Sequence, residues 1–264
     1  MIRGLYTAVS GMITQEARQD VITNNMANVN TVGYKGDNLS VRKFNDVLIQ
    51  NYDKKVNGKN VKNVIGSLSE GSEIDVVKTV YTQGLIQSTD KPTDFALDGS
   101  GFFTVSRNML GTEKQYYSRD GHFHVNSAGY LVNDSGDAVL AKELDNNLNT
   151  VGEPKPIYVG NNSITSDNLG NINIGDKKYK FHTVNFNNYG DLKKVGDNLY
   201  DGANPIEDNN VGVKQNSLEK SNVNVINEMV NMMTVSRTFE SNQKVVQAMD
   251  ETLNKAVNEV GTVR

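Results

Sequence analysis

The chain has 264 residues, enough for one large domain or two small ones, but only 37% of them are hydrophobic, a lower share than is typical of compact globular proteins. The formal net charge of −4 argues against a nucleic-acid-binding surface, which requires clustered positive charge. The sequence contains no cysteine, which excludes disulfides, thiolate metal sites and cysteine nucleophiles.

The N-terminal segment is predicted to form a helix over residues 3–27 that ends in an Asn- and Gly-containing stretch at residues 28–33. Asn side chains compete for backbone hydrogen bonds there, and glycine permits a positive φ. Apolar residues spaced by three, four and three positions share one face of this helix: Ile2, Leu5, Val9 and Met12. This face requires a partner, because amphipathic helices gain most of their stability from packing.

Neither a secretory signal nor a transmembrane helix is predicted. No apolar run of about 7–15 residues follows the first positive charge. No stretch reaches the ~20 apolar residues that span a bilayer. These rules alone predict a cytosolic protein, unless export relies on a signal that they do not cover.

Residues 36–75 are polar and rich in Asn and Lys, and they are predicted to form an extended connector. From Ile74 onward apolar residues alternate, and turn residues recur about every 8–12 positions to residue 200 or so. Asp120-Gly121, between two strand-like segments, is a strong hairpin signal. The pattern predicts an all-β domain over residues 76–216 with these residues in its core: Phe95, Leu97, Phe103, Phe123, Leu131 and Val139.

The C-terminal segment, residues 217–264, carries two rows of residues with heptad spacing. The first row comprises Val225, Met232, Phe239, Val246, Leu253 and Val260. The second row lies three residues after the first and comprises Val235, Asn242, Met249, Ala256 and Val263. This is the a/d pattern of a coiled coil, and a surface helix of an ordinary enzyme seldom keeps it for so long. The seam is expected to pair with the N-terminal helix, with other copies of the chain, or with both.

One seam position is polar. A single Asn at an a or d position commonly fixes the register of a coiled coil at a cost in stability, which is one reading of Asn242. The other reading is that Asn242 lies at the edge of the seam and contacts water.

The elements together predict an α+β fold. Helices at the two ends, residues 1–35 and 217–264, form one discontinuous coiled-coil module that flanks the all-β domain. The alternative is two ordinary terminal helices that lie on a globular core.

The sequence offers no constellation typical of an enzyme. His122 and His124 alternate along a predicted strand and so share one face, but no third metal ligand has a recognisable spacing. Gly99-Ser100-Gly101 lacks the spacing of a nucleophile elbow, and no glycine-rich phosphate loop is present. We therefore expect no catalytic site, no metal and no cofactor.

Several segments, in order along the chain, resemble motifs of the axial proteins of the bacterial flagellum. Residues 1–8 read MIRGLYTA, residues 24–35 NNMANVNTVGYK, residues 82–89 TQGLIQST, residues 94–103 DFALDGSGFF and residues 117–123 YSRDGHF. Residues 221–242 resemble the closing motif of the family. The residues that carry the resemblance are Asn25, Ala27, Asn28, Thr31, Gly33, Tyr34, Lys35, Gly84, Gly101, Phe102, Arg237 and Glu240.

The resemblance covers nearly the whole chain and is closest to the basal-body rod proteins of the FlgG/FlgF type, from the distal or proximal rod. Hook proteins share both ends but carry a longer middle. Met26, Tyr34 and His122 replace the usual Leu, Phe and Asn of the motifs, and residues 36–75 depart from what either rod type leads us to expect.

The resemblance implies a structural subunit of the flagellar rod, located in the basal body in the cell envelope. It implies export by the flagellar type III apparatus, which needs no cleaved signal, and polymerisation through the terminal helices into the tubular shaft that joins motor and hook. The implied partners are other copies and other rod and hook proteins, with no nucleic acid and no small-molecule substrate. The alternative is a secreted or surface β-domain binding module with an oligomerising helical tail, which predicts a concave pocket and a closed oligomer.

Overall fold

A computed structural model describes residues 2–56, 59–109, 112–145, 150–167, 170–208 and 211–260 of the chain. The chain divides into two compact units. The first, here called the helical unit, comprises Met1–Met26, Asp37–Thr79 and Asn224–Arg264; the second, the β unit, comprises Ala27–Gly36 and Val80–Val223. Among the described residues, no helix is sufficiently long and apolar to cross a membrane.

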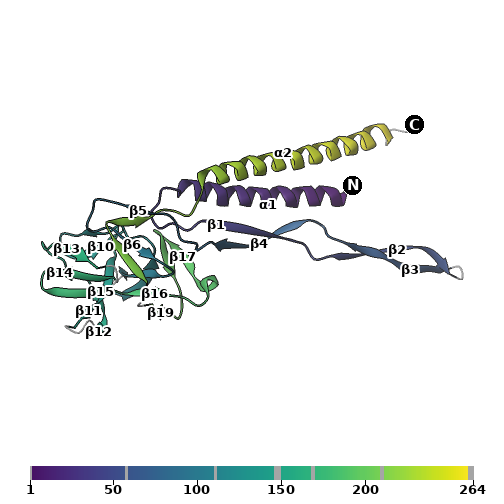
Figure 1. The fold of residues 1–264 in the computed structure, drawn as a ribbon. Helices are drawn as coiled ribbons and strands as arrows, with labels where there is room; N and C mark the ends of the chain where they lie inside the picture. Colours follow the sequence, from purple (N-terminus) through teal and green to yellow (C-terminus); the bar gives the residue numbers. More distant parts are fainter. Residues whose placement is uncertain are drawn as a thin grey trace. The chain divides into compact units, whose positions relative to one another are not determined.

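Two long helices form the first part of the helical unit (Figure 1). Helix α1 spans Ile2–Ala27, and α2 spans Val225–Lys255 and continues into one π-helical segment, η2, over Ala256–Val260. The Asn224 side chain caps α2 by accepting hydrogen bonds from the backbone N–H groups of Ile226 and Asn227. Both terminal helices that the sequence predicts are thus present.

The two helices lie antiparallel and approach closely where α1 has glycines (Figure 1). A Cβ atom on Gly4 would lie 2.5 Å from Cε of Met249, and one on Gly11 would lie 3.0 Å from Nδ2 of Asn242. Between these two contacts the position on α1 moves forward by seven residues and the position on α2 moves back by seven residues.

The predicted connector, residues 36–75, consists mostly of antiparallel strands. β1 (Asp37–Lys43) pairs with β4 (Ser72–Thr79), and β2 (Val47–Val56) pairs with β3 (Lys59–Leu68). The register shifts within both pairs, which interrupts the two-residue alternation by which a strand is recognised in a sequence. The start of β4 is tied to α1, since the Ser72 N–H donates to Oγ of Ser10 at 3.3 Å.

The β unit is built on one branched antiparallel sheet (Figure 1). Its main path runs, in spatial order, through β13 (Ile164–Ser166), β14 (Asn171–Ile174), β15 (Lys177–Phe181), β11 (Ala138–Leu144), β7 (Phe102–Met109), β8 (Thr112–Ser118), β18 (Leu199–Asp201) and β17 (Lys193–Gly196). The strands that branch from it are β9 (His124–Val125), β10 (Leu131–Val132), β12 (Thr150–Pro156), β16 (Thr183–Asn185) and β19 (Ile206–Glu207).

Among the described residues, two smaller strand pairs and one short helix complete the β unit. β6 (Phe95–Asp98) pairs with β20 (Gly212–Gln215), and β5 (Ile86–Ser88) pairs with β21 (Ser217–Glu219). A single 3-10 turn, η1, covers Tyr189–Asp191. Helices at both ends and a β middle confirm the predicted α+β class.

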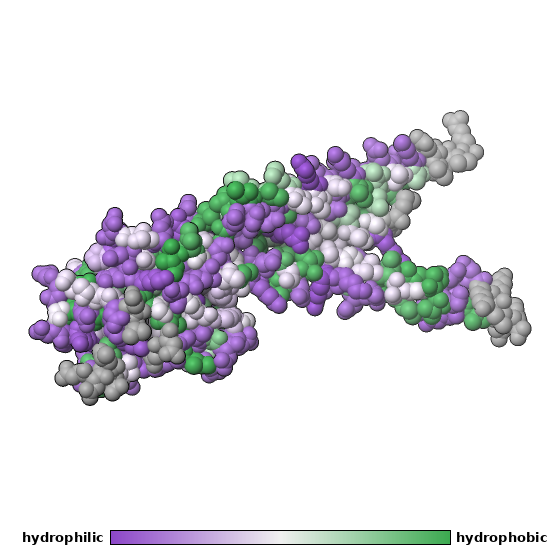
Figure 2. All heavy atoms as spheres, in the orientation of Figure 1, coloured by the Kyte–Doolittle hydropathy of each residue, from purple (hydrophilic) through white to green (hydrophobic). Residues whose placement is uncertain are grey.

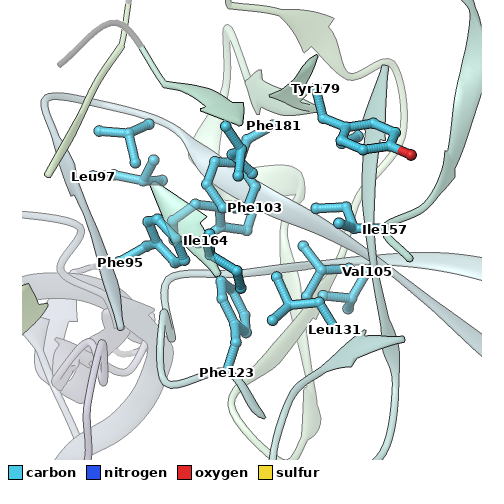
Figure 3. Close-up of a cluster of buried hydrophobic side chains, with 14 of the residues drawn as sticks. Phe95, Leu97, Phe103, Val105, Phe123, Leu131, Ile157, Ile164, Tyr179 and Phe181 are labelled. Carbon is cyan, nitrogen blue, oxygen red and sulfur yellow. The ribbon is translucent and has the colours of Figure 1, made fainter. Parts of the chain in front are cut away.

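The core of the β unit is aromatic and well packed (Figure 3). The rings of Phe103 and Phe123 meet edge to face with centroids 5.3 Å apart, and those of Phe95 and Phe181 do so at 4.8 Å. All six residues predicted for the core are buried, which confirms that part of the sequence analysis: Phe95, Leu97, Phe103, Phe123, Leu131 and Val139.

The hairpin predicted at Asp120-Gly121 is wrong. β8 pairs with β7 and β18, and the segment after Gly121 pairs elsewhere, through a bridge from His122 to Asp94. A Cβ atom on Gly121 would collide with the carbonyl oxygen of Phe95, and the Phe95 N–H donates to the Gly121 carbonyl at 3.0 Å. The glycine therefore permits a close approach of two backbones and does not form a hairpin turn.

Candidate functional site

Residues 28–35, the part of the NNMANVNTVGYK motif that follows α1, lie against residues 219–222 near the C-terminal end of the β unit. The Gly33 N–H donates to the carbonyl of Glu219 at 2.7 Å, and the Asn222 N–H donates to the carbonyl of Tyr34 at 3.4 Å. Within the motif, Oγ1 of Thr31 donates to Oδ1 of Asn28 at 3.2 Å. Two segments almost 190 residues apart in sequence thus lie side by side in the β unit.

Asn222 links the places where the chain enters and leaves the β unit. Its Oδ1 accepts from the Gly36 N–H at 2.8 Å, and its Nδ2 donates to the carbonyl of Val80 at 2.7 Å. The Val80 N–H in turn donates to the Gly36 carbonyl at 2.8 Å. Gly36, Val80 and Val223 are terminal residues of this unit, so one amide side chain holds its connections together.

Glycine is required at two motif positions. Gly33 has a φ of +66°, and a Cβ atom there would lie 2.5 Å from the carbonyl of Arg119. A Cβ atom on Gly84 would collide with the carbonyl oxygen of Lys220. Both positions therefore exclude side chains because another backbone segment passes directly over them.

A buried cluster of three charges lies beside these contacts. Nζ of Lys35 is 2.6 Å from Oε1 of Glu219, and Nη1 of Arg119 is 3.2 Å from Oε2 of the same carboxylate. Nζ also donates to the Thr82 carbonyl at 2.8 Å, and Oε1 accepts from the Gly84 N–H at 2.8 Å. Burial lowers the pKa of Lys35, while the Glu219 carboxylate acts in the opposite direction. We call Lys35, Arg119 and Glu219 the ion cluster.

The ion cluster is positioned to hold backbone segments and has no feature of a catalytic centre. Its three side chains are at most 3% exposed, so they cannot reach a ligand in solution. The guanidinium of Arg119 packs over the ring of Phe102, with Cζ 5.2 Å from the centroid. Removal of the carboxylate would leave two buried cations unpaired, which makes Glu219 the residue on which the arrangement depends.

The remaining motif residues lie in different places. Asn25 is buried in the helical unit, where its amide exchanges two hydrogen bonds with the backbone of Asp37 at 2.8 and 2.9 Å. Tyr34 is buried beneath Nζ of Lys194, and Phe102 is fully buried in an aromatic cluster. The others are located as follows: Gly101 against Val211, and Ala27, Arg237 and Glu240 on the surface.

In the helical unit the heptad positions of α2 lie on its less exposed face. Val235 is buried, and the following seam residues are partly buried: Val225, Met232, Phe239, Asn242, Val246, Met249 and Leu253. Asn242 lies directly against Gly11 of α1. Val260 and Ile2 belong to described helices, but their side chains lie outside the described residues.

The buried face of α1 consists largely of small and polar residues. Leu5 and Met12 are partly buried, whereas Val9 is 39% exposed. The residues of α1 that are buried are Ala8, Thr14, Ile22 and Asn25. Small side chains let α2 approach closely, which apolar periodicity alone does not reveal.

The two histidines lie near aspartate carboxylates. Nδ1 of His122 is 2.8 Å from Oδ1 of Asp94, and both His122 and His124 lie within 4 Å of the Asp134 carboxylate. Among the described residues no group of three or more His, Cys, Asp or Glu side chains could hold a metal ion.

Sequence reasoning did not identify the ion cluster as a unit. Lys35 stood out as a motif residue, but Glu219 lies in a polar stretch without periodicity and its partners are distant in sequence. The feature of the sequence that came nearest to indicating the ion cluster was Arg119, a basic residue within the YSRDGHF motif at residues 117–123.

Comparison with known proteins gives consistent matches over the chain. Residues 5–35 match the family model described as flagella basal body rod protein, residues 96–192 match the D1 domain of flagellar hook protein FlgE/F/G, and residues 214–259 match the C-terminal part of flagellar basal body rod FlgEFG proteins.

Similar proteins match from end to end. The flagellar hook-basal body complex protein FlhO of Bacillus subtilis is 31% identical, with 100% of both chains covered. The flagellar basal-body rod protein FlgG of the same organism is 33% identical over 98% of this chain and 99% of its own. FlgG of Buchnera aphidicola subsp. Schizaphis graminum is 32% identical over 97% and 98%.

Proposed function

Since the chain belongs to the flagellar basal-body rod proteins, and is therefore a structural subunit of the basal body and not an enzyme, we propose that its terminal helices form a coiled-coil module that polymerises. Copies would assemble head to tail into the tubular shaft between motor and hook. The neighbours would be further copies and other rod and hook proteins, and delivery would use the flagellar type III export apparatus.

One observation carries this proposal: the pairing of α1 with α2 leaves much apolar surface uncovered. On α2 the exposed apolar residues include Ile226, Met229, Val230, Met233 and Val245. On α1 they include Tyr6, Val9 and Ile13. Soluble monomers rarely expose contiguous apolar patches of this kind, and such patches commonly mark interaction surfaces.

The seven-residue repeat supports the coiled-coil part of the proposal. A repeat of seven keeps the same face of α2 toward its partner over many turns when the helices supercoil, so each copy presents a continuous seam. A contact that joins different faces of successive copies generates a helical polymer of indefinite length when its rotation does not close into a ring.

The ion cluster and the Asn222 contacts support a rod role for the β unit. They fix the backbone of the β unit at the residues where its sequence segments begin and end, Gly36, Val80 and Val223. Shaft subunits must resist relative motion of their parts, and a buried polar network whose charges are paired provides rigidity.

Electron microscopy of the purified full-length chain after slow concentration tests the proposal. Open helical polymers are the expected result, and a matched chain that ends at residue 223 and lacks α2 should stay monomeric. Discrete dimers or trimers from the full-length chain would instead favour a β-domain binding module with an oligomerising tail.

A further inference from the structure

The helical unit contains an apolar groove on the side of α1 that does not face α2. Its cavity volume is about 650 Å³, and α1 contributes Tyr6, Val9 and Ile13 to its wall. Phe44 adds a ring from the segment after β1, and Tyr6 and Ile13 are 65% and 55% exposed. The groove thus offers uncovered apolar surface with charged groups at its rim.

The same chain carries an apolar stripe of matching form on α2. The stripe begins at Ile226, which is 72% exposed. Met229, Val230 and Met233 lie three, four and seven residues after it, so all four side chains share one face of the helix. Figure 2 shows hydrophobic surface over the first turns of α2. The stripe consists of the exposed positions between the seam residues, so it faces away from the seam.

We propose that the α2 stripe of one copy occupies the groove of a second copy, and that this contact propagates the polymer. The inference rests on the proposed function and names the surfaces that would carry it. An amphipathic helix that lays residues i, i+3, i+4 and i+7 into an apolar groove is a common recognition mode. Methionines suit the role because their flexible side chains fill irregular gaps.

The two surfaces agree in length. The groove residues of α1 extend from Tyr6 to Ile13, and the stripe extends from Ile226 to Met233. In each span the first and last residues are seven positions apart, which is about 10 Å at 1.5 Å per residue. One stripe therefore fills one groove and leaves no apolar turn of either uncovered.

The charges at the rim select one orientation. Glu70 lies beside the Tyr6 end of the groove, since its carbonyl accepts from Oγ1 of Thr7 at 3.3 Å. Arg42 lies toward the other end, where it pairs with Glu73, the neighbour of Ser72. Arg237 follows Met233 on the stripe face of α2 and is exposed. The antiparallel arrangement brings Arg237 toward Glu70, whereas the parallel arrangement brings it toward Arg42.

Groove and stripe lie on opposite sides of the helical unit, because α1 contacts α2 on one side and β4 on the other (Figure 1). One copy therefore cannot satisfy its own groove. The contact is head to tail, and each added copy presents a new stripe and a new groove.

Engineered cysteines test the contact directly, because the chain has none of its own. Ile13→Cys combined with Ile226→Cys places one thiol at each of two ends that the antiparallel arrangement joins. Under mild oxidation, polymers of this variant should give a ladder of covalent dimers, trimers and longer species, and each single variant should stay monomeric under denaturing conditions.

The matched control combines Ile13→Cys with Met233→Cys, which moves the second thiol about 10 Å along α2 and should slow linking at least about tenfold, because a disulfide needs Cα atoms within about 7 Å. Polymers that form normally but give no ladder from the first pair, or that link the control pair equally fast, would overturn the contact and leave the proposed function intact. Failure of the parent chain to polymerise would refute the proposed function itself.

Charge reversal provides a second test that does not depend on thiols. Glu70→Arg and Arg237→Glu should each lower polymer yield at a fixed concentration by about tenfold, and the combined variant should recover it. Recovery would not occur if the single variants merely misfolded. A double variant as defective as either single variant would contradict the Glu70–Arg237 pairing.

Discussion

The β unit and the helical unit contain comparable patterns of apolar residues but bury them to different extents. In the β unit, phenylalanines from several strands pack around one another and are nearly inaccessible, and a buried carboxylate has both of its cations in place. In the helical unit, Val235 is buried while most apolar residues of α2 remain partly or largely exposed. The comparison teaches that the β unit covers its own apolar side chains, whereas the helical unit leaves many of its apolar side chains exposed.

Removal of the Glu219 carboxylate is the most severe change expected for the β unit. Glu219→Ala leaves Lys35 and Arg119 buried without their counter-charge, and breaking a buried ion pair in this way costs about 3–5 kcal/mol. Urea unfolding of the β unit should report a loss of this size. Glu219→Gln also removes the charge but keeps an acceptor for the Gly84 N–H, so it should lose less; equal losses would mean that this retained hydrogen bond contributes nothing.

A charge on the seam should affect the helical unit alone. Phe239→Asp places a carboxylate at a partly buried heptad position, and an unpaired charge in a desolvated seam costs several kcal/mol. Assembly should fail and swimming of a strain that carries only this variant should stop, while the unfolding of the β unit stays unchanged.

The matched control for this prediction is Ser241→Asp, on an exposed polar position of the same helix. It should assemble better than Phe239→Asp. Normal motility with Phe239→Asp would show that the first heptad row is not an assembly surface.

The polar seam position offers a smaller effect. Asn242→Leu replaces the amide that lies against Gly11 with an apolar side chain, and the helix pair should gain about 1 kcal/mol at the cost of register. Circular dichroism should show more helix in the free monomer, and sizing should show mispaired oligomers. Asn227→Leu, on an exposed position of α2, is the control. Identical behaviour of the two variants would leave Asn242 as a solvated edge residue.

The smallest expected effect is a pH dependence confined to the β unit. Burial raises the pKa of Asp120 to about 6 from 3.8, with the nearby Asp134 and Asp94 carboxylates adding to the shift and the His122 N–H and imidazole opposing it. The folded pKa exceeds the unfolded one, so the stability that this proton contributes is complete below about pH 4 and is lost as pH rises through 6.

Asp120→Asn keeps an acceptor for the His122 N–H, but its amide side chain does not titrate in this pH range. Relative to the parent, the variant should therefore gain stability, of order 1 kcal/mol, between pH 4 and 7. Chemical denaturation of both chains across this range measures the difference, and a constant difference would exclude a raised pKa at Asp120.

The sequence allowed some parts of the fold to be predicted because the underlying rules are local. The heptad rows of α2 and the core phenylalanines follow from periodicity, which reports which face of an element is buried. The strands β1 to β3 were not predicted because register shifts break the alternation, whereas the alternation from Ile74 onward did indicate most of β4. Gly121 was misread because a glycine that permits close approach looks the same as one in a turn.

The ion cluster could not be predicted as a unit for a different reason. Lys35 belongs to a recognisable motif, but nothing near Glu219 in the sequence distinguishes it from a solvated acid. The partnership exists only because the fold brings together residues that are 184 positions apart. Periodicity and turn rules describe neighbours in sequence and carry no information at that range.

The sequence separation of the ion cluster also bears on when the β unit can finish folding. Contacts between distant residues require closure of a long loop, and they form late and slowly compared with local turns and helices. A chain that emerges with its N-terminus first cannot complete the Lys35–Glu219 pair until residue 219 has followed. Until then Lys35 lacks its anion. The end of the NNMANVNTVGYK motif is therefore not held in place until the last fifth of the sequence is available.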